Sequence, residues 1–153
     1  MTAMRASILL LFLTLVACGG SGDEESQAQN FIDYPPLWNE YVIGYGETLN
    51  LAEGVTLEFT SVAEDSRCPI DVQCVSEGNA RIVLKTITPR GDGSVSLNTN
   101  PALPDSALFD YYGVELRKLE PFPGAGPQNG SVPVPLNLYE ATVFVVRAAT
   151  PPG

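Results

Sequence analysis

The segment EDSRCPIDVQC, residues 64–74, contains the densest group of chemically active side chains in this sequence. It has three acidic residues, one arginine and two cysteines, Cys68 and Cys74. The thiols could form a redox pair, a thiolate metal site or a disulfide, and the carboxylates could bind calcium or act in glycoside hydrolysis. The C-x5-C spacing differs from the C-x-x-C spacing that is common in redox-active thiol pairs.

The chain contains no histidine. Ser–His–Asp and Cys–His catalysis are therefore excluded, and so are histidine-ligated metal sites. A calcium site built from Asp65, Asp71 and loop carbonyls remains conceivable, but the positive charge of Arg67 would oppose a cation there. We therefore predict no catalytic residue, no metal and no cofactor. A hydrolase that uses two carboxylates is the alternative.

The N-terminal region has the pattern of a secretory signal followed by a tether. Arg5 precedes an apolar run of about a dozen residues, which is too short for the roughly 20 residues of a membrane-spanning helix. The next residues are small, polar and acidic, so they cannot bury enough apolar area to become ordered. We predict a signal peptide over residues 1–17, a flexible acidic tether over 18–33 and a single domain over 34–150.

The end of this signal, Leu15-Val16-Ala17-Cys18, resembles the lipobox of bacterial lipoproteins. This resemblance implies cleavage before Cys18 and attachment of a lipid to its thiol, so that the chain is anchored to a membrane. Gly19 stands where an Asp is associated with inner-membrane retention. The resemblance therefore implies the outer membrane, with the domain facing the periplasm.

The cysteine count supports a disulfide clamp. Three cysteines are an odd number for a secreted chain, and a lipidated Cys18 leaves Cys68 and Cys74 as an even pair. A disulfide is the default for such a pair in an oxidising compartment. Asp65 and Arg67 point to the same side of an extended chain, so we expect them to pair or to bond backbone groups of the loop.

The charge of the chain limits its partners. Eight Lys and Arg residues against 18 Asp and Glu residues give a formal net charge of −10. Phosphate backbones repel such a chain, and the sequence has no basic stripe. We therefore predict no nucleic-acid partner and no electrostatic adhesion to an anionic lipid surface.

The body of the chain alternates between apolar and polar residues with the period of two that marks β-strands, and glycine and proline interrupt it often. This pattern predicts an all-β fold, a small antiparallel β-sandwich or barrel with one intraloop disulfide. We expect a hairpin turn at residues 90–93, an aromatic lid around Trp38 in residues 31–45 and no strand pairing in the proline-rich loop 121–135. The predicted strands are residues 47–51, 55–63, 79–88, 94–99, 111–119 and 139–149.

The stretch EDSRCPIDVQCVSEGNARIVL resembles a family of small secreted bacterial β domains, many of them lipoproteins and without an assigned activity. That family has a DSRCP stretch, a second cysteine and a glycine-containing turn before a strand. The chain departs from this pattern at Ser76 and Glu77, where a tryptophan and a small residue are usual. The resemblance implies fold, disulfide and location, but no catalytic role. The matching structural-motif residues are Asp65, Ser66, Arg67, Pro69 and Gly78.

The combined features predict a non-enzymatic, membrane-anchored module that binds an envelope protein or glycan. Two segments are the expected contact surfaces, residues 100–112 and the loop 121–135. The first holds Phe109, Tyr111 and Tyr112, which suit recognition if they are exposed and pack under the loop if they are not. The alternatives are the two-carboxylate hydrolase and a purely structural envelope protein.

Overall fold

The structure, a computed structural model, describes residues 37–127 and 130–147. The predicted signal peptide over residues 1–17, Cys18 and the tether over 18–33 lie outside these residues. Within the described residues the fold is all-β and its strand pairs are antiparallel, as the sequence predicts. In this part of the chain, no helix is long and apolar enough to cross a membrane.

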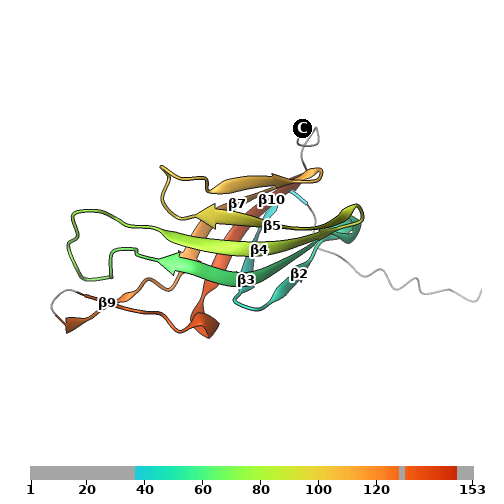
Figure 1. Ribbon diagram of the computed structural model, residues 1–153. Helices are drawn as coiled ribbons and strands as arrows, with labels where there is room; N and C mark the ends of the chain where they lie inside the picture. Colours follow the sequence, from blue (N-terminus) through green and yellow to red (C-terminus); the bar gives the residue numbers. More distant parts are fainter. Residues whose placement is uncertain (1–36, 128–129, 148–153) are drawn as a thin grey trace, which may run out of the picture. The chain divides into compact units, whose positions relative to one another are not determined.

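Two four-stranded sheets form the body of the domain (Figure 1). The first sheet has the order β1-β10-β7-β6, and the second has the order β2-β3-β4-β5. The strands of the first sheet are β1 (Asn39–Gly44), β6 (Ser106–Phe109), β7 (Tyr112–Glu120) and β10 (Glu140–Arg147). The strands of the second sheet are β2 (Thr48–Asn50), β3 (Thr56–Asp65), β4 (Ala80–Thr88) and β5 (Gly91–Asn98).

The core lies between these two sheets. Leu57 and Phe59 on β3, Ile82 and Leu84 on β4 and Val143 on β10 are fully buried. Their neighbours along each strand are more exposed, because successive side chains of a strand point to opposite faces. Buried side chains of both sheets belong to one hydrophobic cluster, so the sheets pack face to face as a sandwich.

The predicted aromatic lid spans residues 31–45, of which 31–36 lie outside the described residues, and the described part does not form a lid. Residues Asn39–Gly44 form β1, an edge strand that pairs with β10. Trp38 is 71% exposed and meets the ring of Phe144 edge-on, with 6.0 Å between the ring centroids. Ile43 is the one fully buried side chain of β1, so the sequence of this strand lacks the alternation by which the other strands are recognised.

The predicted hairpin between β4 and β5 is confirmed, but its turn begins earlier than predicted. Thr88 pairs with Gly91, so the two loop residues are Pro89 and Arg90, and Gly93 lies within β5. The fixed φ of proline suits the first central position of a tight turn. The Thr88 hydroxyl accepts a hydrogen bond from the Arg90 N–H (3.2 Å) and donates one to the Gly91 carbonyl (3.1 Å).

The expectation that loop 121–135 forms no strand pairing is also wrong. A two-stranded ribbon, β8 (Gly124–Ala125) and β9 (Ser131–Val132), forms within it. The four paired residues are not prolines, so each keeps the N–H that a ladder requires. The prolines of the loop lie outside the paired positions.

Two of the connections lie at one end of the sandwich. The β3–β4 connection and the β8–β9 ribbon project from the same end in Figure 1. The chain enters β1 at the other end, where Asn39 pairs with Val145, and Tyr45 then reaches Tyr139 through a backbone hydrogen bond of 2.9 Å. A short 3₁₀ turn, η3 (Leu136–Leu138), lies just before Tyr139 and β10. A second 3₁₀ turn, η1 (Ala52–Gly54), connects β2 to β3.

Candidate functional site

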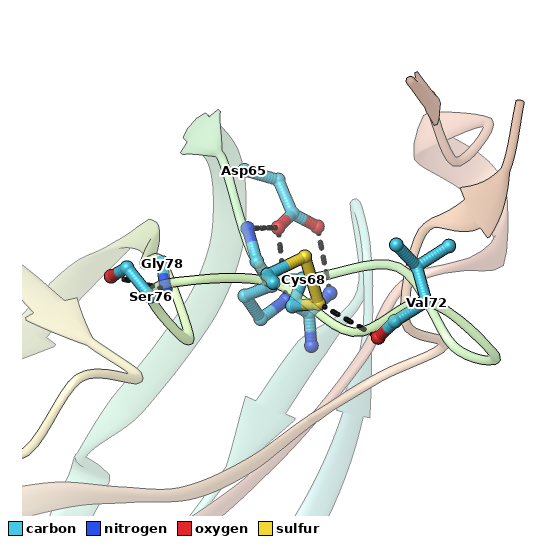
Figure 2. Close-up of a disulfide and its surroundings, with 7 residues drawn as sticks. Asp65, Cys68, Val72, Ser76 and Gly78 are labelled. Atoms are coloured by element: carbon cyan, nitrogen blue, oxygen red, sulfur yellow. Dashed lines mark hydrogen bonds and ion pairs between the residues drawn. A yellow bond between two sulfur atoms is a disulfide. The ribbon is translucent and has the colours of Figure 1, made fainter. Parts of the chain in front are cut away.

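The β3–β4 loop is closed by the predicted disulfide. Cys68 and Cys74 are bonded, with Cα atoms 5.9 Å apart (Figure 2). The Cys68 N–H donates to the Glu77 carbonyl at 2.8 Å, which holds the two sides of the loop together. In the chain-entropy model, closing a loop of about 7 residues stabilises a fold by roughly 2.4 kcal/mol. The clamp interpretation of this segment is therefore confirmed.

Asp65 and Arg67 form a bidentate ion pair at the base of this loop. Arg67 Nη2 lies 2.7 Å from Asp65 Oδ2, and Arg67 Nε lies 2.9 Å from Asp65 Oδ1. The two side chains are only 3% and 9% exposed. Two parallel bonds from a planar guanidinium fix both the distance and the orientation of the pair. The predicted pairing of these residues is confirmed.

The same guanidinium connects the loop to the opposite sheet. Arg67 Nη1 donates to the Leu119 carbonyl near the end of β7, and Nη2 donates to the Pro121 carbonyl at 2.8 Å. Its Cζ also lies 4.5 Å from the centroid of the Phe122 ring. Arg67 therefore holds the chain that leaves β7 against the chain that leaves β3.

Tyr139 completes this buried cluster from a third segment. Its hydroxyl donates to Asp65 Oδ2 at 2.8 Å. Burial raises the pKa of Tyr139, and with the hydrogen bond to the Asp65 carboxylate the value reaches about 12. Burial alone would raise the pKa of Asp65, but hydrogen bonds from Arg67 and Tyr139 outweigh it and hold that pKa below its ordinary value.

Two further motif residues close the loop at its other side. The Ser66 hydroxyl donates to the Asn79 carbonyl (3.0 Å) and accepts from the Asn79 N–H (3.2 Å). Gly78 has a φ of 72°, and a Cβ atom there would lie 1.9 Å from the Ser66 carbonyl oxygen. Only glycine satisfies both conditions. Pro69 is buried beside the disulfide.

The calcium alternative finds little support in this geometry. Both oxygens of Asp65 already accept hydrogen bonds, from Arg67 and from Tyr139. Asp71 is exposed. Among the described residues, no group of three or more His, Cys, Asp or Glu side chains is placed to hold a metal ion.

The aromatic residues of segment 100–112 do not form an exposed contact surface. Phe109 and Tyr112 are buried, and their ring centroids lie 5.7 Å apart. Tyr112 also donates to Glu53 Oε2 at 3.1 Å. Tyr111 is half-buried beneath Arg90, whose Cζ lies 4.5 Å from its ring centroid. The rings pack because residues Ser106–Phe109 are strand β6, which turns Phe109 toward the core.

Exposed apolar side chains instead converge outside the buried cluster. Ile70, Phe122 and Leu138 line a concavity of about 600 Å³ together with Glu120, Pro121 and Glu140. We call this concavity the end cleft. Its walls are linked by a backbone hydrogen bond of 3.1 Å from the Ile70 N–H to the Pro123 carbonyl.

Sequence reasoning located the end cleft only in part. Phe122 lies in the predicted contact loop 121–135, but Ile70 and Leu138 were missed. Both are apolar residues in short stretches next to a proline, Pro69 before Ile70 and Pro135 before the turn that holds Leu138. The prolines indicate that these residues lie in loops, but they do not indicate that three segments distant in the sequence meet at one cleft.

Other concavities occur in the described part of the chain. A groove of about 310 Å³ crosses the outer face of the first sheet, above Gly113 and between Leu108 and Val146. A third concavity of about 400 Å³ lies beside Arg67 and Phe122 and is lined mainly by polar and charged residues. The end cleft differs from both because loop residues held by the disulfide and the buried ion pair form its walls.

Comparison with known proteins adds no assignment. No protein-family model matches the chain, and no curated protein and no solved structure is significantly similar to it. The function must therefore be argued from the site itself.

Proposed function

We propose that this protein is a lipid-anchored envelope protein whose β domain is a non-enzymatic binding module for another envelope protein. The observation that carries the proposal is the end cleft, where exposed apolar side chains from three segments meet on braced loops. The predicted lipid on Cys18 holds the domain at the membrane, and the outer membrane follows from Gly19 in the lipobox resemblance.

The convergence of the side chains distinguishes the end cleft from ordinary surface residues. Single exposed apolar residues are normal on a protein surface, whereas contiguous concave apolar surface commonly marks an interaction site. Ile70, Phe122 and Leu138 are separated by 52 and 16 positions in the sequence, yet they line one concavity. Burying them against a partner would remove apolar surface from contact with water. This hydrophobic contribution is the main favourable term in most protein association.

The bracing of the loops lowers the cost of binding. Arg67 bonds the carbonyls of Leu119 and Pro121 shortly before Phe122. The disulfide closes the loop that holds Ile70, and the Tyr139 hydrogen bond fixes the residue after Leu138. Loops that are already held in place lose little conformational freedom when a partner binds. This arrangement favours a preformed surface over one that orders on binding.

The lining of the cleft favours a protein over a glycan. Glycan sites combine exposed aromatic faces with several hydrogen-bonding side chains, whereas two glutamates are the polar side chains that line this cleft. The one aromatic residue there, Phe122, already has the Arg67 guanidinium above one face of its ring. Asp65, the buried carboxyl of this site, does not suit the acid of a two-carboxylate hydrolase, since that role requires a raised pKa and the pKa of Asp65 is lowered.

The proposal is tested by cross-linking the full chain in the envelope of cells that make it naturally. The cross-linked material is recovered and identified by mass spectrometry. Wild type is compared with Leu138→Ser, in the end cleft, and with Leu108→Ser, on the outer face of the first sheet. Leu108→Ser is the matched control, because Leu138 and Leu108 are similarly exposed, at 53% and 57%.

We expect a protein partner that is recovered with wild type and Leu108→Ser and is lost with Leu138→Ser. Equal recovery with all three chains, or no partner with wild type, would contradict the proposal. A Tyr112 variant is unsuitable for this test because Tyr112 is buried and its loss would damage the core. The mass of the mature N-terminus tests the anchor separately, and Cys18→Ser should release the protein from the membrane.

A further inference from the structure

We infer that the end cleft binds a polypeptide segment in which Lys or Arg side chains flank a large apolar side chain. This inference rests on the proposed binding function and specifies the chemistry of the partner. The argument combines the apolar walls of the cleft with the charges at its rim.

The rim of the end cleft is acidic. Glu120 and Glu140 line the concavity beside the apolar residues. Asp71 directly follows Ile70 and is exposed. A partner whose apolar side chain enters the cleft would therefore place its flanking residues near carboxylates.

The neighbouring cations neutralise only part of this rim. Lys118 pairs with Glu120 at 2.8 Å, but both side chains are at least half exposed, so the pair is weak and its glutamate can exchange partners. Arg67 is buried and committed to Asp65 and to two carbonyls. Within residues 37–127 and 130–147, Glu140 forms no ion pair.

Charge complementarity then selects the partner. An apolar side chain in the cleft gains from burial, and flanking ammonium or guanidinium groups gain from the carboxylates at the rim. A segment with acidic flanks would bring like charges together and would be rejected. The net charge of −10 for the whole chain adds long-range attraction for a cationic partner.

A photo-crosslinking amino acid at a defined position tests this inference. Leu138 in the full chain is replaced by p-benzoylphenylalanine in cells that make the protein naturally, and the cross-linked peptide of the partner is sequenced. The same replacement at Leu108 is the matched control. The charge of the rim is then reversed with Glu140→Lys. Asp92→Lys is the matched control for that change, because Asp92 is exposed beside the β4–β5 turn.

We expect the peptide cross-linked at position 138 to carry a net positive charge and at least one large apolar residue. We expect Glu140→Lys to lower the cross-linking yield about fivefold and Asp92→Lys to leave it unchanged. A neutral or acidic peptide, or an unchanged yield with Glu140→Lys, would overturn the inferred chemistry of the partner. Neither result would contradict the proposed binding function. A yield at position 138 no higher than at position 108 would overturn the proposed function itself.

Discussion

The buried ion pair of Asp65 and Arg67 is the residue-level feature on which the loop end depends. The two residues are two positions apart, so their pairing can be inferred from an extended chain alone. Their contacts with Leu119, Pro121 and Tyr139 cross more than 50 positions of sequence and cannot be inferred that way. The ion pair thereby joins three segments that are distant in the sequence.

Replacing this arginine should cost much of the stability of the fold. In Arg67→Met, the buried Asp65 carboxylate loses its partner, and we expect the free energy of unfolding to fall by about 3–5 kcal/mol. Urea denaturation measures this loss. Arg81→Met is the matched control, because Arg81 pairs with Glu64 at 3.8 Å on the surface, and it should change the stability by no more than about 0.5 kcal/mol. Equal losses in the two variants would contradict the role of Arg67.

The lowered pKa of Asp65 predicts a specific loss of stability in acid. The folded protein holds this carboxyl ionised at a pH where the unfolded chain protonates it, so the unfolded state binds more protons. The stabilisation is present above the ordinary aspartate pKa of about 3.9, and it is lost as the pH falls from there through the lower folded value. Urea midpoints measured at decreasing pH should fall more steeply for wild type than for Asp65→Asn. Parallel curves would exclude this contribution.

At the scale of the element, the β3–β4 loop depends on one glycine for its path. Gly78→Ala places a Cβ atom against the Ser66 carbonyl in addition to imposing a positive φ on alanine. Gly46→Ala is the matched control, because Gly46 has a φ of 78° and nothing within 4 Å of the added atom. The control should cost about 1–3 kcal/mol for its backbone conformation, and Gly78→Ala should cost at least about 1 kcal/mol more. Thermal unfolding of both variants measures the difference, and similar losses would refute the close approach.

The long strands that sequence reasoning predicted have a buried face, whereas the short edge strand β2 was predicted although none of its residues is buried. Strand β4 alternates along its whole length because it buries every second side chain in the core, and β3 alternates in its first half, up to Phe59. Strands β1 and β6 were missed because they are edge strands with few buried residues, and the pairing of β8 with β9 was missed because prolines surround it. The disulfide was predictable from the number of cysteines, whereas the end cleft was not, because it forms where three loops meet.

At the scale of the whole molecule, the excess of acidic residues opposes the compact state. The chain has 8 basic and 18 acidic side chains, so ten negative charges have no positive counterpart. The exposed ion pairs of the described residues, such as Lys118 with Glu120, contribute only about 0–1 kcal/mol each. The buried pair of Asp65 and Arg67 is screened little by salt. Repulsion should therefore dominate the response of this protein to ionic strength.

We accordingly expect sodium chloride to stabilise the folded protein. Raising its concentration shortens the range of charge interactions to about 10 Å at 0.1 M and to about 3 Å at 1 M, which weakens the self-repulsion. The urea midpoint at neutral pH should therefore rise with salt. Replacing Asp92 and Glu77, two exposed acids, by lysine brings the net charge from −10 to about −6 and should reduce this rise. A midpoint that falls with salt in wild type would mean that surface ion pairs, and not the excess negative charge, dominate the electrostatics of the fold.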